Sequence, residues 1–274
     1  MEAQIMITPV FTSTYSIGGH SLLTLDEPEK SKPGGALSVF DLTKRGNLTQ
    51  VVLEDRKIDG FLQAYKSAKA AKVQLIYGLR LTVCADAAQK DPASAKTESA
   101  ISVFCRNTQG YHDLLRLWSR AATIGHYDGR ARADWAMVRE LWTDNLVLAL
   151  PFFSSFLAVN TLTFNRVVPQ LPSGIKHWVC DEVDGGGLPF SPLIRAAVQG
   201  YVKDSGGLAE VWPVKSVRYA EPGDFKALMV LRCLAEKSSF DKPEVPHLSS
   251  PLFSFAAYQE LVRTAAQTPS AVLS

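Results

Sequence analysis

The chain has 274 residues, of which 46% are hydrophobic and 20% charged, a balance that is typical of a folded protein with a sizeable core. A formal net charge of +2 excludes a strong overall attraction to nucleic acid. The sequence has no apolar run of membrane-spanning length, no basic secretory start and no C-x-x-C pair among its four cysteines. We therefore expect a cytoplasmic protein with reduced thiols and no membrane partner.

Expected strands and helices alternate through the first half of the chain. Short apolar runs predict strands, and apolar residues at helical spacing predict helices. In chain order we expect a strand over 5–11, a helix over 39–45 that Gly46 ends, a strand over 51–53, a helix over 61–68, strands over 73–76 and 79–83, a strand over 101–105 and a helix over 111–121. The polar segment 86–98 is predicted to be an exposed loop.

The alternation continues through the second half of the chain. The expected elements are a helix over 135–142, a strand over 146–150, a helix over 193–202, strands over 209–212 and 214–217, and a helix over 225–235. The apolar stretch 146–162 contains a proline and polar residues, which favours a buried strand and a loop. Short buried strands that alternate with helices predict a parallel α/β barrel rather than two separate halves.

Residues 6–16, with the sequence MITPVFTSTYS, carry the most informative pattern of the chain. They resemble the opening strand of the PHP (polymerase and histidinol phosphatase) domain of bacterial DNA polymerase III alpha subunits, in which alternate residues are histidines and Ser-x-Tyr-Ser follows. The Ser-x-Tyr-Ser end is present here, whereas Thr8, Val10 and Thr12 stand at the histidine positions. Alternate strand residues point to one face, so three imidazoles at this spacing can converge on a metal, and two threonines and a valine cannot.

Further segments resemble the same family in the same order along the chain. They are residues 51–58, 65–70, 73–83, 107–114 and 212–225, and residues 247–252 with the helix after them are loosely similar to the end of the domain. The resemblance implies an α/β fold, a distorted (β/α)7 barrel over residues 1–262, with a C-terminal tail over 263–274.

The resemblance also assigns the family's metal-ligand positions to this chain, and nearly all of them carry a different residue. These vestigial positions are Thr8, Val10, Thr12, Gly19, Glu54, Asp55, Arg80, Ala100, Ser216 and Arg218. Only Glu54 and Asp55 could bind a divalent ion, and two neighbouring carboxylates make a poor site without imidazoles. We therefore predict no bound metal, no cofactor and no catalytic residue at these positions.

Two arginines would place positive charge where the family places metal. The resemblance puts Arg80 and Arg218 at ligand positions, so we expect them to lie near each other at the C-terminal mouth of the barrel. Glu54 and Asp55 are expected to pair with them through charge-assisted hydrogen bonds.

Histidines and acidic residues elsewhere could form other sites. The five histidines lack the spacing of a shared metal site, which favours surface or core roles; they are His20, His112, His126, His177 and His247. An acidic cluster, Asp181, Glu182 and Asp184, precedes a glycine run. A solvated loop is favoured there over a cation site or a phosphate site.

One stretch of the chain is locally basic. Its arginines are Arg116, Arg120, Arg130, Arg132 and Arg139. The stretch either contacts DNA or covers exposed helix faces, and the near-neutral total charge does not decide between the two. Direct binding of nucleic acid is therefore left open.

Two functions follow from these observations. The resemblance implies a non-catalytic module of DNA replication, which binds to or stands in for part of a polymerase III-type alpha subunit and has a polymerase or a proofreading exonuclease subunit as its partner. The alternative is a metal-dependent phosphoesterase or exonuclease with a rebuilt site that uses Glu54, Asp55 and histidines from elsewhere in the chain.

Overall fold

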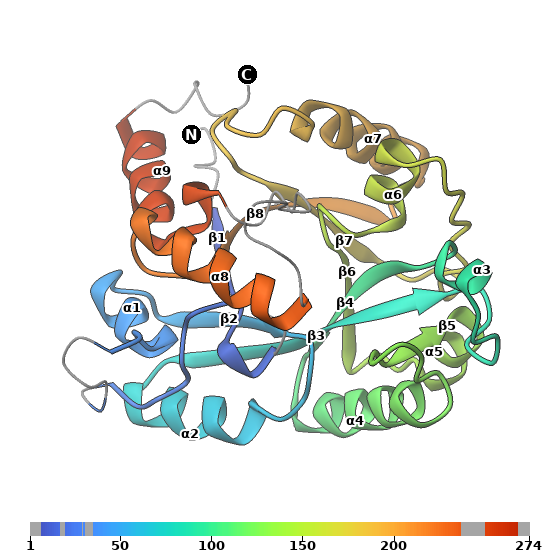
Figure 1. Cartoon of the computed structure of the whole chain (residues 1–274), viewed down its shortest axis with the longest axis horizontal. Helices are drawn as coiled ribbons and strands as arrows, with labels where there is room; N and C mark the ends of the chain where they lie inside the picture. Colours follow the sequence, from blue (N-terminus) through green and yellow to red (C-terminus); the bar gives the residue numbers. More distant parts are fainter. Residues whose placement is uncertain (1–6, 17–19, 29, 31–34, 237–249, 268–274) are drawn as a thin grey trace. The chain divides into compact units, whose positions relative to one another are not determined.

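The structure, a computed structural model, describes residues 7–16, 20–28, 30, 35–236 and 250–267 (Figure 1). These residues form two compact units. The first comprises the described parts of Met1–Tyr77, Glu182–Leu188 and Pro213–Ser274, and the second comprises Gly78–Asp181 and Pro189–Trp212. Among the described residues no helix is both long and apolar enough to cross a membrane.

Parallel strands form the centre of the first unit. Strand β1 (Thr8–Phe11) lies between β2 (Gln50–Asp55) and β8 (Ala209–Val217), with Val10 opposite both Val52 and Ser216. Because side chains alternate along a strand, residues in register share a face. The face that carries Phe11, Leu53 and Val217 is fully buried.

Helices of the first unit begin and end where the local sequence allows. Helix α1 (Val39–Arg45) starts at Ser38, whose hydroxyl accepts a hydrogen bond from the amide of Phe40, and it ends at Gly46 as predicted. Helix α2 (Phe61–Ala71) ends at a residue in the left-handed conformation. Helices α8 (Phe225–Glu236) and α9 (Phe255–Gln267) complete the unit, and the ring of Phe255 lies 6.1 Å from that of Phe11.

The second unit contains the remaining strands, and one of them runs against its neighbours. These strands are β3 (Gln74–Cys84), which begins in the first unit, β4 (Ser99–Cys105), β5 (Arg132–Asp134), β6 (Leu146–Leu150) and β7 (His177–Glu182). Strand β4 pairs antiparallel with β3 and with β6, whereas β3 with β5 and β6 with β7 are parallel. The helices of this unit are α3 (Pro92–Ala95), α4 (Thr108–Thr123), α5 (Trp135–Leu141), α6 (Phe156–Leu162) and α7 (Ser191–Asp204).

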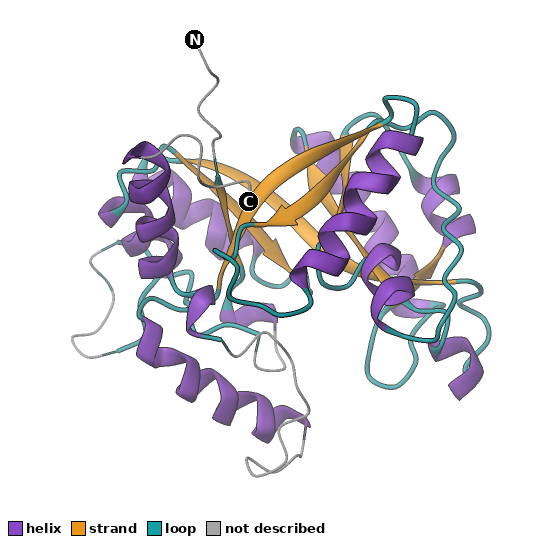
Figure 2. Cartoon of the chain, turned by 90° about the horizontal axis from the view of Figure 1, so that it is seen from above, coloured by secondary structure: helices purple, strands orange, loops and turns teal. Residues whose placement is uncertain are grey.

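The strand order closes on itself. It runs β2-β1-β8-β7-β6-β4-β3, and β3 also pairs with β2, while β5 is added beside β3. The protein is therefore a mixed α/β barrel of seven strands surrounded by helices, which confirms the predicted fold class (Figure 2). The expectation of a wholly parallel barrel is wrong because of β4.

Several predicted elements differ from the structure. The runs 73–76 and 79–83 form the single strand β3, and 209–217 is likewise one strand. The segment 86–98 is no simple exposed loop, because it contains α3 and buries Ala87 and Ser94. The stretch after β6 forms helix α6 instead of a loop, β7 was not predicted, and α9 continues beyond the predicted boundary at residue 262.

Candidate functional site

Most of the vestigial metal positions lie on one face of the parallel strands in the first unit. Residues in register show this directly, because Val10 lies opposite Ser216, and Thr8 opposite Val214. The pairing continues past the strand ends, where the amide of Thr12 donates to the carbonyl of Val217 at 3.2 Å. The positions on this face are Thr8, Val10, Thr12, Glu54, Ser216 and Arg218. The period of two residues thus brings these six positions together, as the sequence pattern predicts.

The carboxylate of Asp55 holds the turn that follows β1. It accepts hydrogen bonds from the backbone amide of Ser13 at 2.8 Å, from the hydroxyl of Ser13 at 2.8 Å and from the hydroxyl of Ser16 at 2.7 Å. Asp55 is fully buried, and burial raises its pKa above the ordinary value, although these hydrogen bonds oppose the shift. Its partners are therefore the two serines of the Ser-x-Tyr-Ser motif, and the prediction that Asp55 pairs with an arginine is wrong.

Arg218 holds the segment that continues from this turn. Its guanidinium donates to the carbonyl of His20 at 3.0 Å, and its own carbonyl accepts from the amide of Leu22 at 2.9 Å and from the hydroxyl of Ser21 at 2.8 Å. The side chain is 3% exposed and lies over the ring of Phe253 at 5.7 Å. A cation therefore stands where the family resemblance places a metal ligand.

A second buried carboxylate, Glu182 of the predicted acidic cluster, lies beside Ser216. Glu182 accepts from the amide of Ser216 at 2.9 Å and from its hydroxyl at 2.7 Å, and the ammonium group of Lys215 is 3.5 Å away. Glu182 and Asp184 are buried, so the expectation of a solvated acidic loop is wrong for both. A predicted strand over β7 would have placed Glu182 at its carboxyl end, where the site residues of barrels gather.

The second unit holds two further vestigial positions on one strand pair. Arg80 on β3 lies opposite Ser102 on β4, and Ala100 lies opposite Thr82. Arg80 and Ala100 therefore share a face of this antiparallel pair. Gly19 lies outside the described residues. The expected proximity of Arg80 and Arg218 stays a prediction, because the two belong to different units.

The residues at these positions do not fit a metal centre. Among the described parts of the chain no three or more His, Cys, Asp and Glu side chains form a group suited to a metal ion. The lone pairs of Asp55 already accept hydrogen bonds, and Glu182 is bonded to Ser216 and Lys215. Of the other described positions Glu54 alone carries a carboxylate, and the threonine, valine, alanine, serine and arginine residues do not supply the nitrogen, sulfur or carboxylate ligands that transition metals prefer.

His177 and the arginines of the basic stretch have structural partners. His177 is buried, with one ring nitrogen 3.1 Å from the carbonyl of Ile175 and the other 2.9 Å from the hydroxyl of Tyr201, and burial lowers its pKa. His247 lies outside the described residues. The arginines of the locally basic stretch each contact another residue: Arg116 with Asp113, Arg120 with Glu140, Arg130 with Asp128, Arg132 with Glu98 and Arg139 with Gln170. These contacts favour structural roles over DNA contact for this stretch.

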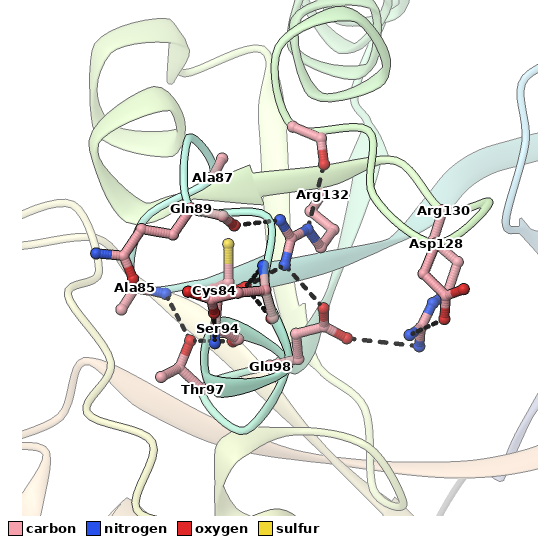
Figure 3. A network of polar contacts seen from close by, with 12 residues as sticks. Cys84, Ala85, Ala87, Gln89, Ser94, Thr97, Glu98, Asp128, Arg130 and Arg132 are labelled. Atoms are coloured by element: carbon pink, nitrogen blue, oxygen red, sulfur yellow. Dashed lines mark hydrogen bonds and ion pairs between the residues drawn. The ribbon is translucent and has the colours of Figure 1, made fainter.

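Arg132 is the most heavily bonded of these arginines (Figure 3). Its fully buried guanidinium donates to the carbonyls of Gly125 at 3.2 Å and Gln89 at 2.7 Å, and to the hydroxyl of Ser94 at 3.0 Å. It also meets the carboxylate of Glu98 at 3.2 Å. These bonds hold the segment between β3 and β4, which explains why that segment is no simple exposed loop.

Comparison with known proteins supports part of the family resemblance. Residues 36–162, slightly under half of the chain, match the family model of the PHP domain. No curated protein matches the chain significantly. Among solved structures, a protein from Bifidobacterium adolescentis assigned as a metal-dependent phosphoesterase is similar over 84% of both chains, with 10% sequence identity and a TM-score of 0.28. A similarity this low supports neither a fold nor a function for the chain.

Proposed function

We propose that this chain is a PHP-type protein without a working metal centre, and that it acts as a non-catalytic module in DNA replication. Support comes from the PHP match over residues 36–162 and from the resemblance of the Ser-x-Tyr-Ser strand and the later segments to polymerase III alpha subunits. The module would bind a polymerase or a proofreading exonuclease subunit, because the resemblance is to the supporting domain of a replicative polymerase.

The hydrogen bonds of Asp55 are the observation that carries the proposal. A carboxylate that binds a metal must offer its oxygen lone pairs to the ion. Both oxygens of Asp55 instead accept bonds from Ser13 and Ser16, and the bonds tie a turn to the end of β2. The carboxylate is thus used to hold backbone in place.

The nearby positive charges support the same conclusion. A metal-dependent phosphoesterase uses its ions to activate water and to offset charge on the phosphoryl oxygens. Arg218 could offset such charge, but an arginine stays protonated and cannot take a proton from water. Its guanidinium is also engaged with the carbonyl of His20.

A rebuilt phosphoesterase site is the second candidate function. One observation favours it, because burial raises the pKa of Asp55, and a raised pKa is what a carboxylate general base needs near neutral pH. Asp55 is fully buried, however, so water would have to displace Ser13 or Ser16 to reach it.

Hydrolysis assays distinguish these two functions. We expect the purified chain to hydrolyse p-nitrophenyl phosphate and single-stranded DNA at background rates, with or without added manganese. The Asp55→Asn variant, which keeps the size of the side chain, should give the same rates. Manganese-dependent turnover that disappears in Asp55→Asn would contradict the non-catalytic function and favour the rebuilt site.

A binding assay tests the replication role separately. The purified chain would be titrated into the polymerase III-type alpha subunit and, in parallel, into the proofreading exonuclease subunit of the organism that encodes it. We expect a complex with at least one of them, measured by sedimentation velocity. Failure to bind either subunit would overturn the replication role and leave the conclusion about catalysis intact.

A further inference from the structure

We propose that the exposed face of helix α2 binds single-stranded nucleic acid. This α2 face consists of Leu62, Tyr65, Lys66 and Lys69, with Lys72 directly after the helix. It lies within the first unit, in the cyan helix labelled α2 in Figure 1. The proposal is independent of the partner and the catalytic status proposed above.

The periodicity of α2 separates its exposed face from its packed face. Residues 62, 65, 66 and 69 recur at the spacing that lines one side of a helix. Ala64, Ser67 and Ala68 lie on the opposite side and are buried, and the hydroxyl of Ser67 donates to the carbonyl of Leu25 at 2.6 Å. The α2 face is therefore turned away from the packed side of its own unit.

The charge of the α2 face is positive and uncompensated. Helix α2 contains no acidic residue. Lys66, Lys69 and Lys72 are not buried, and within the described ranges none of them forms an ion pair or side-chain hydrogen bond. Lysines one helical turn apart present ammonium groups along a line, which suits the repeated negative charges of a nucleic-acid backbone.

An aromatic ring lies among these lysines. Tyr65 is 55% exposed, and its ring stacks on that of Phe61 with a centroid distance of 6.1 Å and an interplanar angle of 26°. Phe61 in turn packs edge-on against Tyr77 at 5.0 Å, and the hydroxyl of Tyr77 donates to the carbonyl of Lys57 at 3.1 Å. The Tyr65 ring is thus supported from behind by a second ring that is itself fixed.

A supported exposed ring beside cations favours nucleic acid over other anionic partners. Unpaired bases stack on aromatic side chains while lysines contact the phosphates, and this combination binds single strands with little sequence preference. An acidic peptide would use the lysines without needing the ring. A membrane surface would require a wider apolar face than Leu62 and Tyr65 provide.

Fluorescence anisotropy with a labelled oligothymidine, about 20 nucleotides long to exceed the site size of a single-strand-binding module, tests the proposal. We expect the intact chain to bind, and the double variant Lys66→Gln/Lys69→Gln to bind at least about tenfold more weakly at low salt. That variant should also reduce the slope of log affinity against log salt by about 1.4, because each lost phosphate contact on a single strand contributes about 0.7. Tyr65→Ala should weaken binding about tenfold, and Tyr65→Phe should retain it.

The arginines of α4 supply a matched control. Arg116→Gln/Arg120→Gln removes the same charge from another exposed helix, where both arginines have acidic partners, and should leave affinity within about twofold. Equal losses in the two double variants would mean that only total charge matters and would overturn the proposal. Binding that is insensitive to Tyr65→Ala, or equally tight binding to polyglutamate or to phosphatidylserine vesicles, would overturn it as well.

Discussion

Asp55 in the first unit and Arg132 in the second are both fully buried charges that hold a loop, but their charges are compensated differently. Arg132 has a carboxylate partner in Glu98, two backbone carbonyls and the ring of Tyr127 at 4.6 Å. Asp55 is held by an amide and two hydroxyls, all of them neutral. Arg132 therefore has an opposite charge among its partners, whereas Asp55 has only neutral donors.

This difference should make substitutions of the two residues differ in their energetic effect. A buried carboxylate held only by neutral donors is costly. The two serines offset part of that cost through their hydrogen bonds. Substitutions at the two anchors should accordingly differ in size and in pH dependence.

Loss of the Arg132 side chain should have the largest effect on stability. Arg132→Met keeps much of the side-chain volume but leaves the carbonyls of Gly125 and Gln89 without this donor, and Glu98 keeps only its exposed partner Arg130. We expect the free energy of unfolding to fall by about 3–5 kcal/mol, measured by urea denaturation. Arg130→Met is the control, because Arg130 is an exposed partner of the same Glu98, and it should cost less than about 1 kcal/mol. Equal effects would mean that burial of Arg132 adds nothing.

Loss of the Asp55 carboxylate should lower the free energy of unfolding less than loss of Arg132. The substitution also removes the cost of burying a carboxylate that is held only by neutral donors. Asp55→Ala leaves the amide of Ser13 and two hydroxyls without an acceptor, and we expect a loss of about 2–4 kcal/mol by the same measurement. Asp59→Ala changes an exposed aspartate in the same segment and should stay within about 0.5 kcal/mol. An Asp55→Ala protein as stable as wild type would show that the turn after β1 is held by other contacts.

The smallest expected effect is a pH dependence that only the Asp55 anchor should show. Burial raises the pKa of Asp55 in the folded protein above the ordinary value of 3.8, so the folded state binds this proton more tightly than the unfolded state. The contribution of Asp55 to stability should therefore rise as the pH falls through the folded pKa towards 3.8.

Asp55→Asn removes this titration and isolates its effect. The difference in unfolding free energy between wild type and Asp55→Asn should change in favour of wild type as the pH is lowered, by about 1.4 kcal/mol for each unit of pH between the two pKa values. The raised pKa of Asp55 would be contradicted if this difference stayed constant as the pH is lowered from neutral towards the ordinary pKa of an aspartate. It would also be contradicted if the difference changed in favour of the variant.

Local signals in the sequence account for the elements that were predicted well. Gly46 after the last turn predicts the observed end of α1, since caps act within a few residues; Ser38, whose hydroxyl caps the first turn in the structure, was not used in the prediction. Strand β7, with the sequence HWVCDE, was missed because its apolar run has only three residues and lies between a histidine and two acidic residues, without a simple alternation. The antiparallel direction of β4 depends on pairing with β3 and β6, which no local pattern specifies.

In the candidate site, too, some features follow from the local sequence and others depend on distant residues. The common face of Thr8, Val10 and Thr12 follows from the period of a strand and was predictable. The partners of Asp55 were not, because they lie 42 and 39 residues away in the chain, although Ser13 and Ser16 both belong to a motif that the sequence analysis noted. Glu182 was noticed as part of an acidic cluster, but its burial beside Ser216 was not predicted because the strand that carries it was missed.

The order of the strands has a consequence for synthesis on the ribosome. Strand β1 pairs with β8, so residue 8 finds its partner only after residue 214 has been made. At a translation rate of about 5–20 residues per second, the edge of β1 that pairs with β8 stays unpaired for roughly 10–40 s. The second unit lies almost wholly between these strands, and its largest part is the continuous segment Gly78–Asp181. That segment can fold during the wait, whereas an early strand with an open edge is exposed to chaperones and to pairing with other nascent chains.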